Sequence, residues 1–323
     1  MTDAPAPTAA RAGTSSAPGA SRFHLIPLLE RRQAAGTVFR AALYVAALAL
    51  AAVLSVALLA IAGVAPPDLG REISAVAFSS PRALASVLVQ AAPFIVAGLA
   101  TAVAFRAGFW NIGLEGQMIL GAIFAAFIAI HDIGPDSLRL ILMALAAALG
   151  GMVWIAGPGY LKHKLGVNEI ITTLLLNYVA FNLLLHLVYG PWQDPETRFP
   201  HTEQFGDAER LARLGWQSLT WALPFAAVLA AVLWWVLAIS RVGYLVDLMR
   251  DNADMARAVG VPVLGLSAAA ILGSGALGGL TGFVIATGIE GRVTENFFIG
   301  YLFSGVLIAF LGRNNPIGVV AFA

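Results

Sequence analysis

"GFWNIGLEGQMILG", residues 108–121, stands between two apolar runs that are long enough to cross a lipid bilayer. An apolar run of about 18 or more residues with few charges is typical of a membrane-spanning helix. A charged side chain in hydrocarbon costs at least about 2.5–3.5 kcal/mol, so acids at this depth normally face protein or a watery path. The carboxylate, amides and glycines of this stretch therefore mark a departure from a plain membrane helix.

The composition of the whole chain indicates a membrane protein. Of its 323 residues, 59% are hydrophobic and 11% are charged, and the mean hydropathy is +0.83. A soluble domain carries roughly 25% charged residues, so this chain has too little charge to cover a water-facing surface. We predict an all-α fold, a polytopic bundle of membrane helices with a broken or re-entrant helix near 105–121.

Several functions are disfavoured by what the sequence lacks. A net charge of +1 argues against a nucleic-acid partner, and the absence of cysteine excludes disulfides and thiolate metal sites. The five histidines are scattered without ligand spacing, so no metal site is predicted. No phosphate-binding G-x-x-x-x-G-K-[ST] loop, nucleophile elbow or zinc-protease helix is present. We therefore predict no catalytic residue and no ATP hydrolysis by this chain.

The chain divides into a tail and a membrane domain. Residues 1–38 are rich in Ala, Pro, Ser, Thr and Gly and predict a disordered tail, followed by a transmembrane domain over 39–323. Apolar runs predict helices near 41–64, 82–104, 114–130, 139–157, 167–189, 219–239, 263–287 and 297–311. The final "PIGVVAFA" begins another apolar run without room for about 20 residues, so we expect the C-terminal end to be incomplete.

The basic residues predict the orientation of these helices. Arginines gather on the side of the tail, for example in 31–40 and 241–257, whereas most acids fall on the opposite side, many in the loop 190–218. Because loops rich in Lys and Arg stay on the cytoplasmic side, we expect a cytoplasmic N-terminus.

Two interpretations of 108–121 are open from the residues alone. Asn111 and Glu115 would share one face of a helix, but each glycine costs a helix interior about 1 kcal/mol. A break here would expose backbone N–H groups, which membranes tolerate only where protein or water satisfies them. Either a broken helix lines a substrate path, with Gln117 beside it, or a cytoplasmic loop precedes an ordinary span with Glu115 near the interface.

A polar stripe runs along a second stretch, "GVNEIITTLLLNYVAFN", residues 166–182. The stripe repeats every fourth residue and consists of Glu169, Thr173 and Asn177. Asn168 lies on a neighbouring face. In lipid these residues must face a cavity or other helices, where each hydrogen bond is worth about 0.6 kcal/mol. An interfacial salt bridge from Glu169 to Lys162 or Lys164 is a further alternative.

Two more stretches carry structural signals. "ILGSGALGGLTGF", residues 271–283, places small residues four apart, which predicts close helix packing through Gly275, Gly278, Gly279 and Gly282. The polar stretch 241–262 on the cytoplasmic side contains a short helix that Asp251 or Asn252 can cap and that ends at Gly260. It serves either as a solvated connector or as a docking helix for a soluble partner.

Four stretches together resemble a known family. "FRAGFWNIGLEGQMILGA", "GVNEIITTLLLNYVAFN", "RDNADMARAVGV" and "IGYLFSGVLIAFLGRNNPIG" are similar to the permease subunits of bacterial ABC importers for nucleosides and simple sugars, within the ribose and branched-chain amino-acid permease superfamily. The resemblance extends in order from near residue 80 to near 320 and is greatest to the longer permease of nucleoside importers. Trp110 and Leu114 depart from the commoner Phe and Ala of that family.

The resemblance implies a multi-pass protein of the bacterial cytoplasmic (inner) membrane with several partners. These are a second, homologous permease subunit in a heterodimer, a cytoplasmic ATPase that binds ATP and Mg, and an extracytoplasmic substrate-binding lipoprotein. No cofactor is implied for this chain. The resemblance places Asn111 and Glu115 beside the translocation path and Asn168, Glu169 and Asn177 on the matching helix, and it makes the segment with Asp254, Arg257 and Gly260 the helix that couples to the ATPase.

The substrate and the transport class stay open at this point. Phe109 and Trp110 would stack on a nucleobase, a contact worth about 1–3 kcal/mol, or serve as interfacial anchors. The nucleoside importer has a sugar importer as its nearest alternative. An ion-coupled secondary carrier would use Glu115 and Glu169 as ion sites, and a receptor or structural membrane protein would need neither.

Overall fold

The computed structural model describes residues 37–65, 67–68, 70–71 and 80–323. Two compact units result, one ending at Leu69 and the other beginning at Gly70. The predicted tail lies outside the described residues except for Thr37 and Val38, which begin the first helix. Helix α1 (Thr37–Ile61) forms the first unit, and its side chains from residue 42 to 61 are exposed within that unit. A helix that is apolar all round requires a lipid or protein environment.

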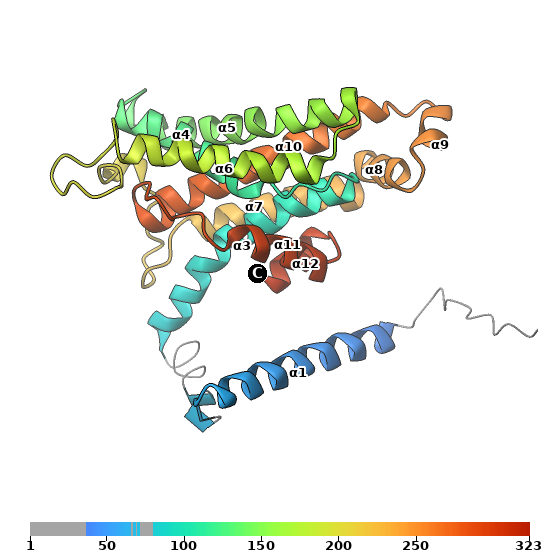
Figure 1. The fold of residues 1–323 in the computed structure, drawn as a ribbon, viewed down its shortest axis with the longest axis horizontal. Helices are drawn as coiled ribbons and strands as arrows, with labels where there is room; N and C mark the ends of the chain where they lie inside the picture. The colour runs from blue at the N-terminus through green and yellow to red at the C-terminus, as the bar shows by residue number, and fades with distance from the viewer. Residues whose placement is uncertain (1–36, 66, 69, 72–79) are drawn as a thin grey trace, which may run out of the picture. The chain divides into compact units, whose positions relative to one another are not determined.

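The second unit is a helical bundle (Figure 1). Its helices are α3 (Pro81–Arg106), α4 (Leu114–Ile130), α5 (Asp136–Leu165), α6 (Glu169–Val188), α7 (Ala222–Trp234), α8 (Arg241–Asp251), α9 (Ala253–Ala258), α10 (Val263–Ile285), α11 (Tyr301–Leu311) and α12 (Pro316–Phe322). Short elements are the 3₁₀ turn η1 (Asp207–Glu209) and the π turns η2 (Trp235–Ile239) and η3 (Ala286–Glu290), which extend α7 and α10. All the predicted helices are present, and the all-α membrane fold is confirmed.

Local sequence signals set several helix ends. The Ser80 hydroxyl accepts a hydrogen bond from the N–H of Ala83 at 3.2 Å, and Pro81 begins α3, where a missing N–H costs nothing. Gly166 ends α5 in the left-handed conformation that glycine adopts freely, with φ of 65°. Asn168 then caps α6 by accepting a hydrogen bond from the N–H of Ile170 at 2.9 Å. These signals place the α5–α6 turn next to the residues of the candidate site.

One predicted boundary is wrong. The helix expected over 139–157 extends from Asp136 to Leu165, with Pro158 inside it. Proline removes one helical hydrogen bond, but neighbouring helices in a membrane bundle can compensate for that loss. The extension matters because it carries Lys162 and His163 on the last turn of α5.

Six described helical segments are long and apolar enough to cross a membrane. They are Ala42–Ile61, Pro81–Arg106, Asp136–Leu165, Glu169–Val188, Ala222–Ile239 and Val263–Glu290. Helix α4 is shorter, with 17 residues. At about 1.5 Å per residue it rises about 26 Å, less than the roughly 30 Å of a hydrocarbon core. The non-helical residues that precede α4 therefore complete its path through the bundle.

Glycines allow α10 to lie at the centre of the bundle against α3, α4 and α5. A Cβ atom on Gly279 would collide with the Ala147 carbonyl of α5, and one on Gly282 would collide with the Met118 carbonyl of α4. Gly275 meets Gly151 of α5 in the same way, whereas Gly278 faces the Gln117 side chain. Gly275, Gly279 and Gly282 thus lie where backbones approach closely, and Gly278 lies where a side chain packs against α10.

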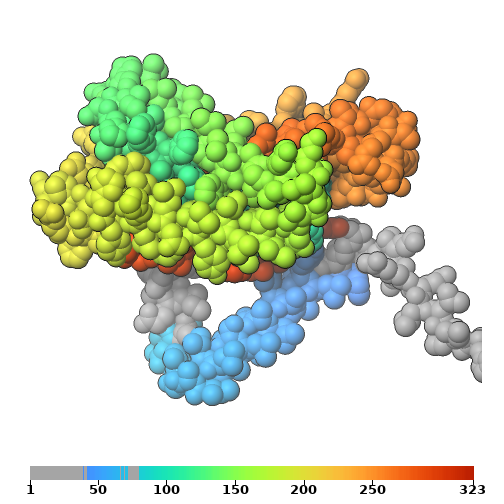
Figure 2. All heavy atoms as spheres, turned by 45° about the horizontal axis from the view of Figure 1, so that its top comes forward, coloured from blue at the N-terminus to red at the C-terminus, as the bar shows by residue number. Residues whose placement is uncertain are grey.

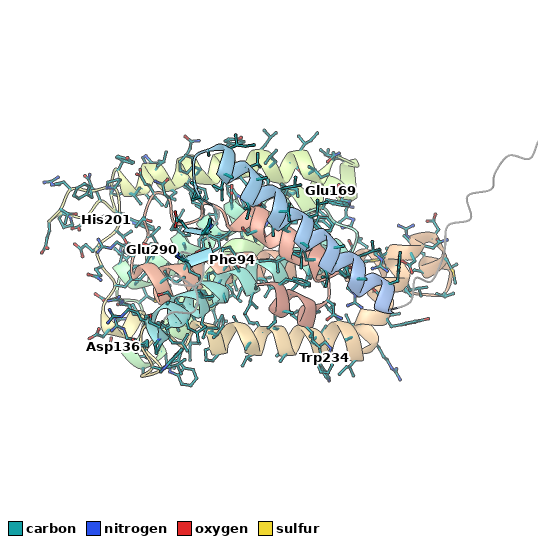
Figure 3. The ribbon with its side chains drawn as sticks, turned by 90° about the horizontal axis from the view of Figure 1, so that it is seen from below. Phe94, Asp136, Glu169, His201, Trp234 and Glu290 are labelled. Carbon is teal, nitrogen blue, oxygen red and sulfur yellow. The ribbon has the colours of Figure 1, made fainter. Side chains whose placement is uncertain are left out.

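The bundle has two different ends (Figures 1 and 2). Helices α8 and α9 lie at one end, and the long segment between α6 and α7 lies at the other. His201 in that segment forms a β-bridge with Thr294, and Glu209 binds Arg139 of α5 at 2.8 Å. Figure 3 labels His201, Glu290 and Asp136 at this end and Glu169 toward the end of α8 and α9.

Candidate functional site

The candidate site forms around the non-helical segment between α3 and α4. Helix α3 ends at Arg106, Gly108 turns the chain with φ of 75°, and α4 begins at Leu114. The segment is not a solvated loop, because the side chains of Phe109 and Asn111 are each 1% exposed. Backbone groups buried at this depth need partners from the protein or from water. We call residues 107–117 and the side chains that bind them the polar junction.

The polar stripe of α6 supplies most of these partners. The Glu169 carboxylate accepts a hydrogen bond from the N–H of Trp110 at 3.3 Å, and the Thr173 hydroxyl accepts one from the N–H of Ile112 at 3.3 Å. Asn177 accepts from the N–H of Gly116 at 2.9 Å and donates to the Ile112 carbonyl at 3.0 Å. The stripe therefore supplies hydrogen-bond partners for four backbone groups that lack the partners of a continuous helix.

Asn111 lies at the centre of the polar junction. Its amide pairs reciprocally with Gln117, donating at 3.1 Å and accepting at 2.8 Å. It also donates to the Ser274 hydroxyl of α10 at 2.9 Å and accepts from the N–H of Gly113 at 3.0 Å. An amide side chain has two donors and two acceptor positions. All of them are used inside the protein, so Asn111 holds the segment in place in this conformation.

Lys162 of α5 closes the polar junction at the end nearest α8. Its ammonium pairs with the Glu169 carboxylate, donates to the Gly108 carbonyl at 3.2 Å, and lies 5.2 Å from the centre of the Phe109 ring. The salt bridge left open by the sequence is thus present with Lys162, while Lys164 is exposed. With its ring buried and covered by Lys162, Phe109 offers no exposed face for stacking on a ligand.

Close packing leaves no room for side chains at two glycines of this segment. A Cβ atom on Gly116 would lie 2.5 Å from the Trp154 indole nitrogen, and one on Gly113 would lie 2.9 Å from the Thr173 Cβ atom. The Trp154 indole N–H is buried and has no hydrogen-bond partner among the described residues. Gly113 and Gly116 are therefore required for steric reasons, because any larger side chain would collide with its neighbours.

The remaining predicted path residues are more accessible. Glu115 is half-buried and, among the residues that the structure describes, has no hydrogen-bond or ion-pair partner. Trp110 is 47% exposed and packs against Phe105 and Phe310, with ring centres 4.9 and 6.0 Å away. Asn168 is exposed and caps α6 outside the polar junction. The predicted set therefore divides into buried anchors, the exposed helix cap Asn168, and two side chains, Glu115 and Trp110, that have free surface at the polar junction.

Sequence reasoning missed two members of this neighbourhood. Ser274 bridges Asn111 to the Ala100 carbonyl, donating to it at 2.7 Å. Its signal was its position as one of two hydroxyl residues, with Thr281, among the packing glycines of 271–283. Phe310 comes from α11 and joins Trp110 only in three dimensions, so no local pattern indicated it.

The predicted coupling segment forms two short helices. Asn252, and not Asp251, caps α9 by accepting a hydrogen bond from the N–H of Met255 at 2.9 Å. Asp254 and Arg257 pair on the exposed side of α9, and Gly260 turns the chain out of it with φ of 85°. Asp251 is exposed and pairs with the neighbouring Arg250. Met255 and Val259 are also exposed, so α9 presents apolar and charged groups together.

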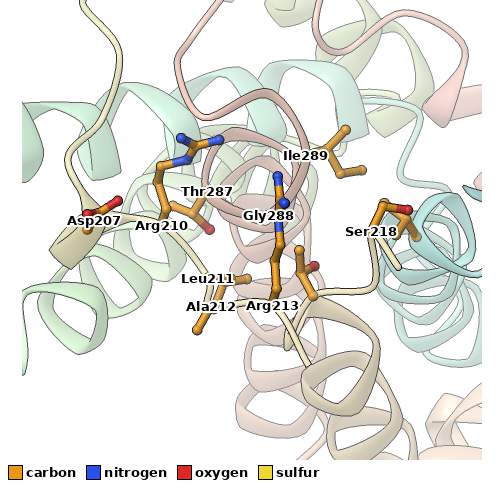
Figure 4. Close-up of a pocket in the computed structure, with 11 residues that line it drawn as sticks. Asp207, Arg210, Leu211, Ala212, Arg213, Ser218, Thr287, Gly288 and Ile289 are labelled. Carbon is orange, nitrogen blue, oxygen red and sulfur yellow. The ribbon is translucent and has the colours of Figure 1, made fainter. Parts of the chain in front are cut away.

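The opposite end of the bundle contains a cavity of about 540 Å³ (Figure 4). Arg210 and Arg213 border it from the segment before α7, and Thr287 and Gly288 border it from η3. Neither arginine has an ion-pair partner among the described residues. None of the residues predicted to line a path borders this cavity, so it is separate from the polar junction.

Comparison with known proteins identifies relatives over most of the chain. The family model described as branched-chain amino acid transport system / permease component matches residues 83–323. A glucose ABC transporter permease of Haloferax volcanii is 37% identical over 73% of this chain and 65% of its own length. A guanosine ABC transporter permease of Bacillus subtilis is 31% identical over 72% and 68%. A nucleoside ABC transporter permease of Lactococcus lactis is 28% identical over 76% and 70%.

The chain thus spans about two thirds of the length of these relatives, and 65% in the case of the Haloferax protein. No solved structure gives a significant match. Six apolar spans and the family match agree on a membrane protein with several spans. The chain belongs to the family of ABC transporter permeases described as the branched-chain amino acid transport system permease component.

Proposed function

We propose that this chain is the permease subunit of an ABC importer and forms part of the membrane path for nucleosides. The observation that carries the proposal is the non-helical segment 107–113, which lies within a membrane bundle with Phe109 and Asn111 buried and is held by the stripe of α6. A continuous helix would cross the membrane at lower cost. A fold that keeps such a break and satisfies it with side chains from three helices is typical of a transport path.

The polar junction suggests separate roles for the predicted path residues. Asn111, Gln117 and the α6 stripe hold the segment, because their hydrogen bonds are made within the protein. Glu115 and Trp110 contact water or cargo, because one is an unpartnered carboxylate and the other has half of its surface free. A carboxylate accepts hydrogen bonds from sugar hydroxyls, and an indole ring stacks on a base.

The substrate class follows from the relatives. Two of the three are named for guanosine or nucleosides, which supports a nucleoside. The relative named for glucose has the higher identity, 37%, and makes a simple sugar the second candidate. Both cargoes offer hydroxyl groups to Glu115, so the base is the feature that separates them, through stacking on Trp110.

In this proposal, partner proteins supply the energy for transport and deliver the substrate. A cytoplasmic ATPase binds ATP and Mg and docks on α9, whose exposed Met255, Val259 and Arg257 form a mixed apolar and charged surface. A second, homologous permease completes the path, and an external lipoprotein delivers the substrate. The chain lies in a bacterial inner membrane with α8 and α9 in the cytoplasm, and it carries no catalytic residue of its own.

Reconstitution of the complete complex in proteoliposomes tests this function. Labelled guanosine and labelled glucose are offered with the binding lipoprotein, with ATP or with a non-hydrolysable analogue inside. We expect guanosine uptake only when ATP is hydrolysed. Uptake that persists without ATP and follows an imposed proton or sodium gradient would instead identify an ion-coupled carrier.

A further inference from the structure

We propose that Arg106 and Asp247 form the joint through which movement of α8 and α9 reaches the polar junction. This inference rests on the proposed function, since it assigns a route between the ATPase and the path. Both are positioning residues, because neither is placed beside cargo.

The joint is a two-point ion pair. The Arg106 guanidinium, on the last residue of α3, donates to one Asp247 carboxylate oxygen at 2.8 Å and to the other at 2.7 Å. The side chains are 15% and 35% exposed, so water screens the pair only in part. A bidentate pair fixes the relative orientation of its partners as well as their distance. Helix α8 is therefore held to the end of α3 in a defined pose.

An apolar cluster beside the ion pair strengthens the same contact. Ala107, the first residue of the segment between α3 and α4, is buried against Val246 and Met249 of α8. These two residues lie on one face of α8 with Gly243, where a Cβ atom would collide with the Leu237 carbonyl. The buried face of α8 thus packs at its start against the end of the α7 extension and further along against Ala107, next to the Arg106 ion pair.

The position of the joint gives it a consequence for transport. Arg106 and Ala107 directly precede Gly108, whose carbonyl is held by Lys162. A displacement of α8 must therefore either move the start of the segment or break the ion pair and the apolar cluster together. The Asp254–Arg257 ion pair lies within α9 itself, and short turns join α9 to α8 on one side and to α10 on the other. A force applied to α9 therefore has two routes into the bundle, and the route through α8 passes the joint.

Other charges near Asp247 are few and belong to α8. Arg250 lies 3.6 Å from the same carboxylate, one turn along the helix, and also pairs with Asp251. Arg250 stays on α8 when α8 moves, so it cannot replace the link to α3. Loss of Arg106 therefore leaves Asp247 with a partner but removes the connection between the two elements.

Charge exchange tests the joint in the reconstituted complex. The variants are Arg106→Asp, Asp247→Arg and the double exchange, and uptake and ATP hydrolysis are measured on the same vesicles. We expect each single variant to lower uptake per ATP hydrolysed at least about tenfold, within the range of coupling between sites, while hydrolysis continues. The double exchange should recover a substantial part of the uptake per ATP hydrolysed, because it restores opposite charges at the same place.

Asp136→Asn is the matched control. It also removes a carboxylate from an arginine ion pair, with Arg139 at 2.8 Å, but at the opposite end of the bundle. We expect this variant to keep the uptake per ATP hydrolysed of the unmodified chain. A milder variant, Asp247→Asn, should give an intermediate ratio and covers the case in which a reversal prevents complex assembly.

Two results would overturn the joint. One is an unchanged uptake per ATP hydrolysed in Asp247→Asn and in both single charge reversals, Arg106→Asp and Asp247→Arg. The other is a parallel fall of uptake and hydrolysis that the double exchange does not recover, which indicates a structural role alone. Failure of the proposed function is distinguishable, because the unmodified complex would then show no dependence of uptake on ATP.

Discussion

The polar junction and helix α9 use the same kinds of side chain in opposite ways. In the junction, Asn111 and Asn177 are buried and their amide groups bind backbone and side chains of other segments. In α9, Asp254 and Arg257 are exposed and bind each other. Buried polar groups are costly when unpaired and rigid when paired, whereas exposed pairs add little stability. The hydrogen bonds of the polar junction thus fix its conformation, whereas the exposed side chains of α9 are accessible to a partner protein.

The largest expected effect comes from breaking the junction at Asn177. Asn177→Leu leaves the N–H of Gly116 and the carbonyl of Ile112 without partners, and each buried unsatisfied group costs about 1–3 kcal/mol. We expect a lower melting temperature of the purified chain and loss of uptake. Asn182→Leu is the control on the same helix, since Asn182 is exposed and binds only the carbonyl of Tyr178. Equal melting temperatures for the two variants would contradict the role of the junction.

The next effect comes from reversing a charge on α9. Arg257→Glu should abolish uptake and leave membrane insertion and melting temperature unchanged, because Arg257 is exposed and its ion pair, with Asp254, lies within its own helix. Binding of the ATPase to the purified permease measures the cause directly. Lys164→Glu, at an exposed position ending α5, should keep both binding and uptake. Wild-type uptake in Arg257→Glu would remove α9 as the docking element.

A smaller effect is expected from neutralising the ion pair that closes the junction. Glu169→Gln keeps an oxygen for the N–H of Trp110 but loses the charge that pairs with Lys162. We expect uptake to fall about tenfold, the loss associated with 1.4 kcal/mol. Glu290→Gln removes an exposed acid at the end of η3 and should change uptake less. If the two variants transported equally, Glu169 would have no special role in the path.

The smallest effect concerns the long segment at the other end of the bundle and its response to acid. The N–H of Glu196, the Thr197 hydroxyl and nearby His201 lower the pKa of Asp194. A lowered folded-state pKa stabilises the segment above the unfolded pKa, about 3.9, and this stability is lost as the pH falls through the folded value.

Proteolysis of the segment between α6 and α7 should therefore accelerate below about pH 4. Asp194→Asn should remove this dependence, because the amide does not titrate. The rate at neutral pH is the reference for both proteins. An acid response that persists in the variant would assign it to another group.

The features of the fold that depend on short-range sequence patterns could be predicted from the sequence. Apolar runs located the helices, the four-residue repeat located the α6 stripe, and glycines located the break before α4. Contacts between residues far apart in the chain could not be predicted, because no local sequence pattern indicates them. Arg106 and Asp247 are 141 residues apart, and Ser274 reaches Asn111 only because α10 lies at the centre of the bundle. The helix predicted to end at residue 157 continues to Leu165 and so brings Lys162 over the Phe109 ring. Phe109 is buried in a cluster with Ile155 and Ile271, which are far from it in the sequence.

The most direct test of the central claim is the access of water to Glu115. The chain has no cysteine, so Glu115→Cys gives this chain a single thiol, and its labelling by a charged, water-soluble reagent in the assembled complex is measured on this chain. Leu175→Cys, at an exposed apolar position of α6, serves as the reference. We predict fast labelling at position 115 that substrate slows, and slow labelling at position 175. Labelling at 115 that is no faster than at 175, with or without substrate, would contradict a wet path beside the polar junction.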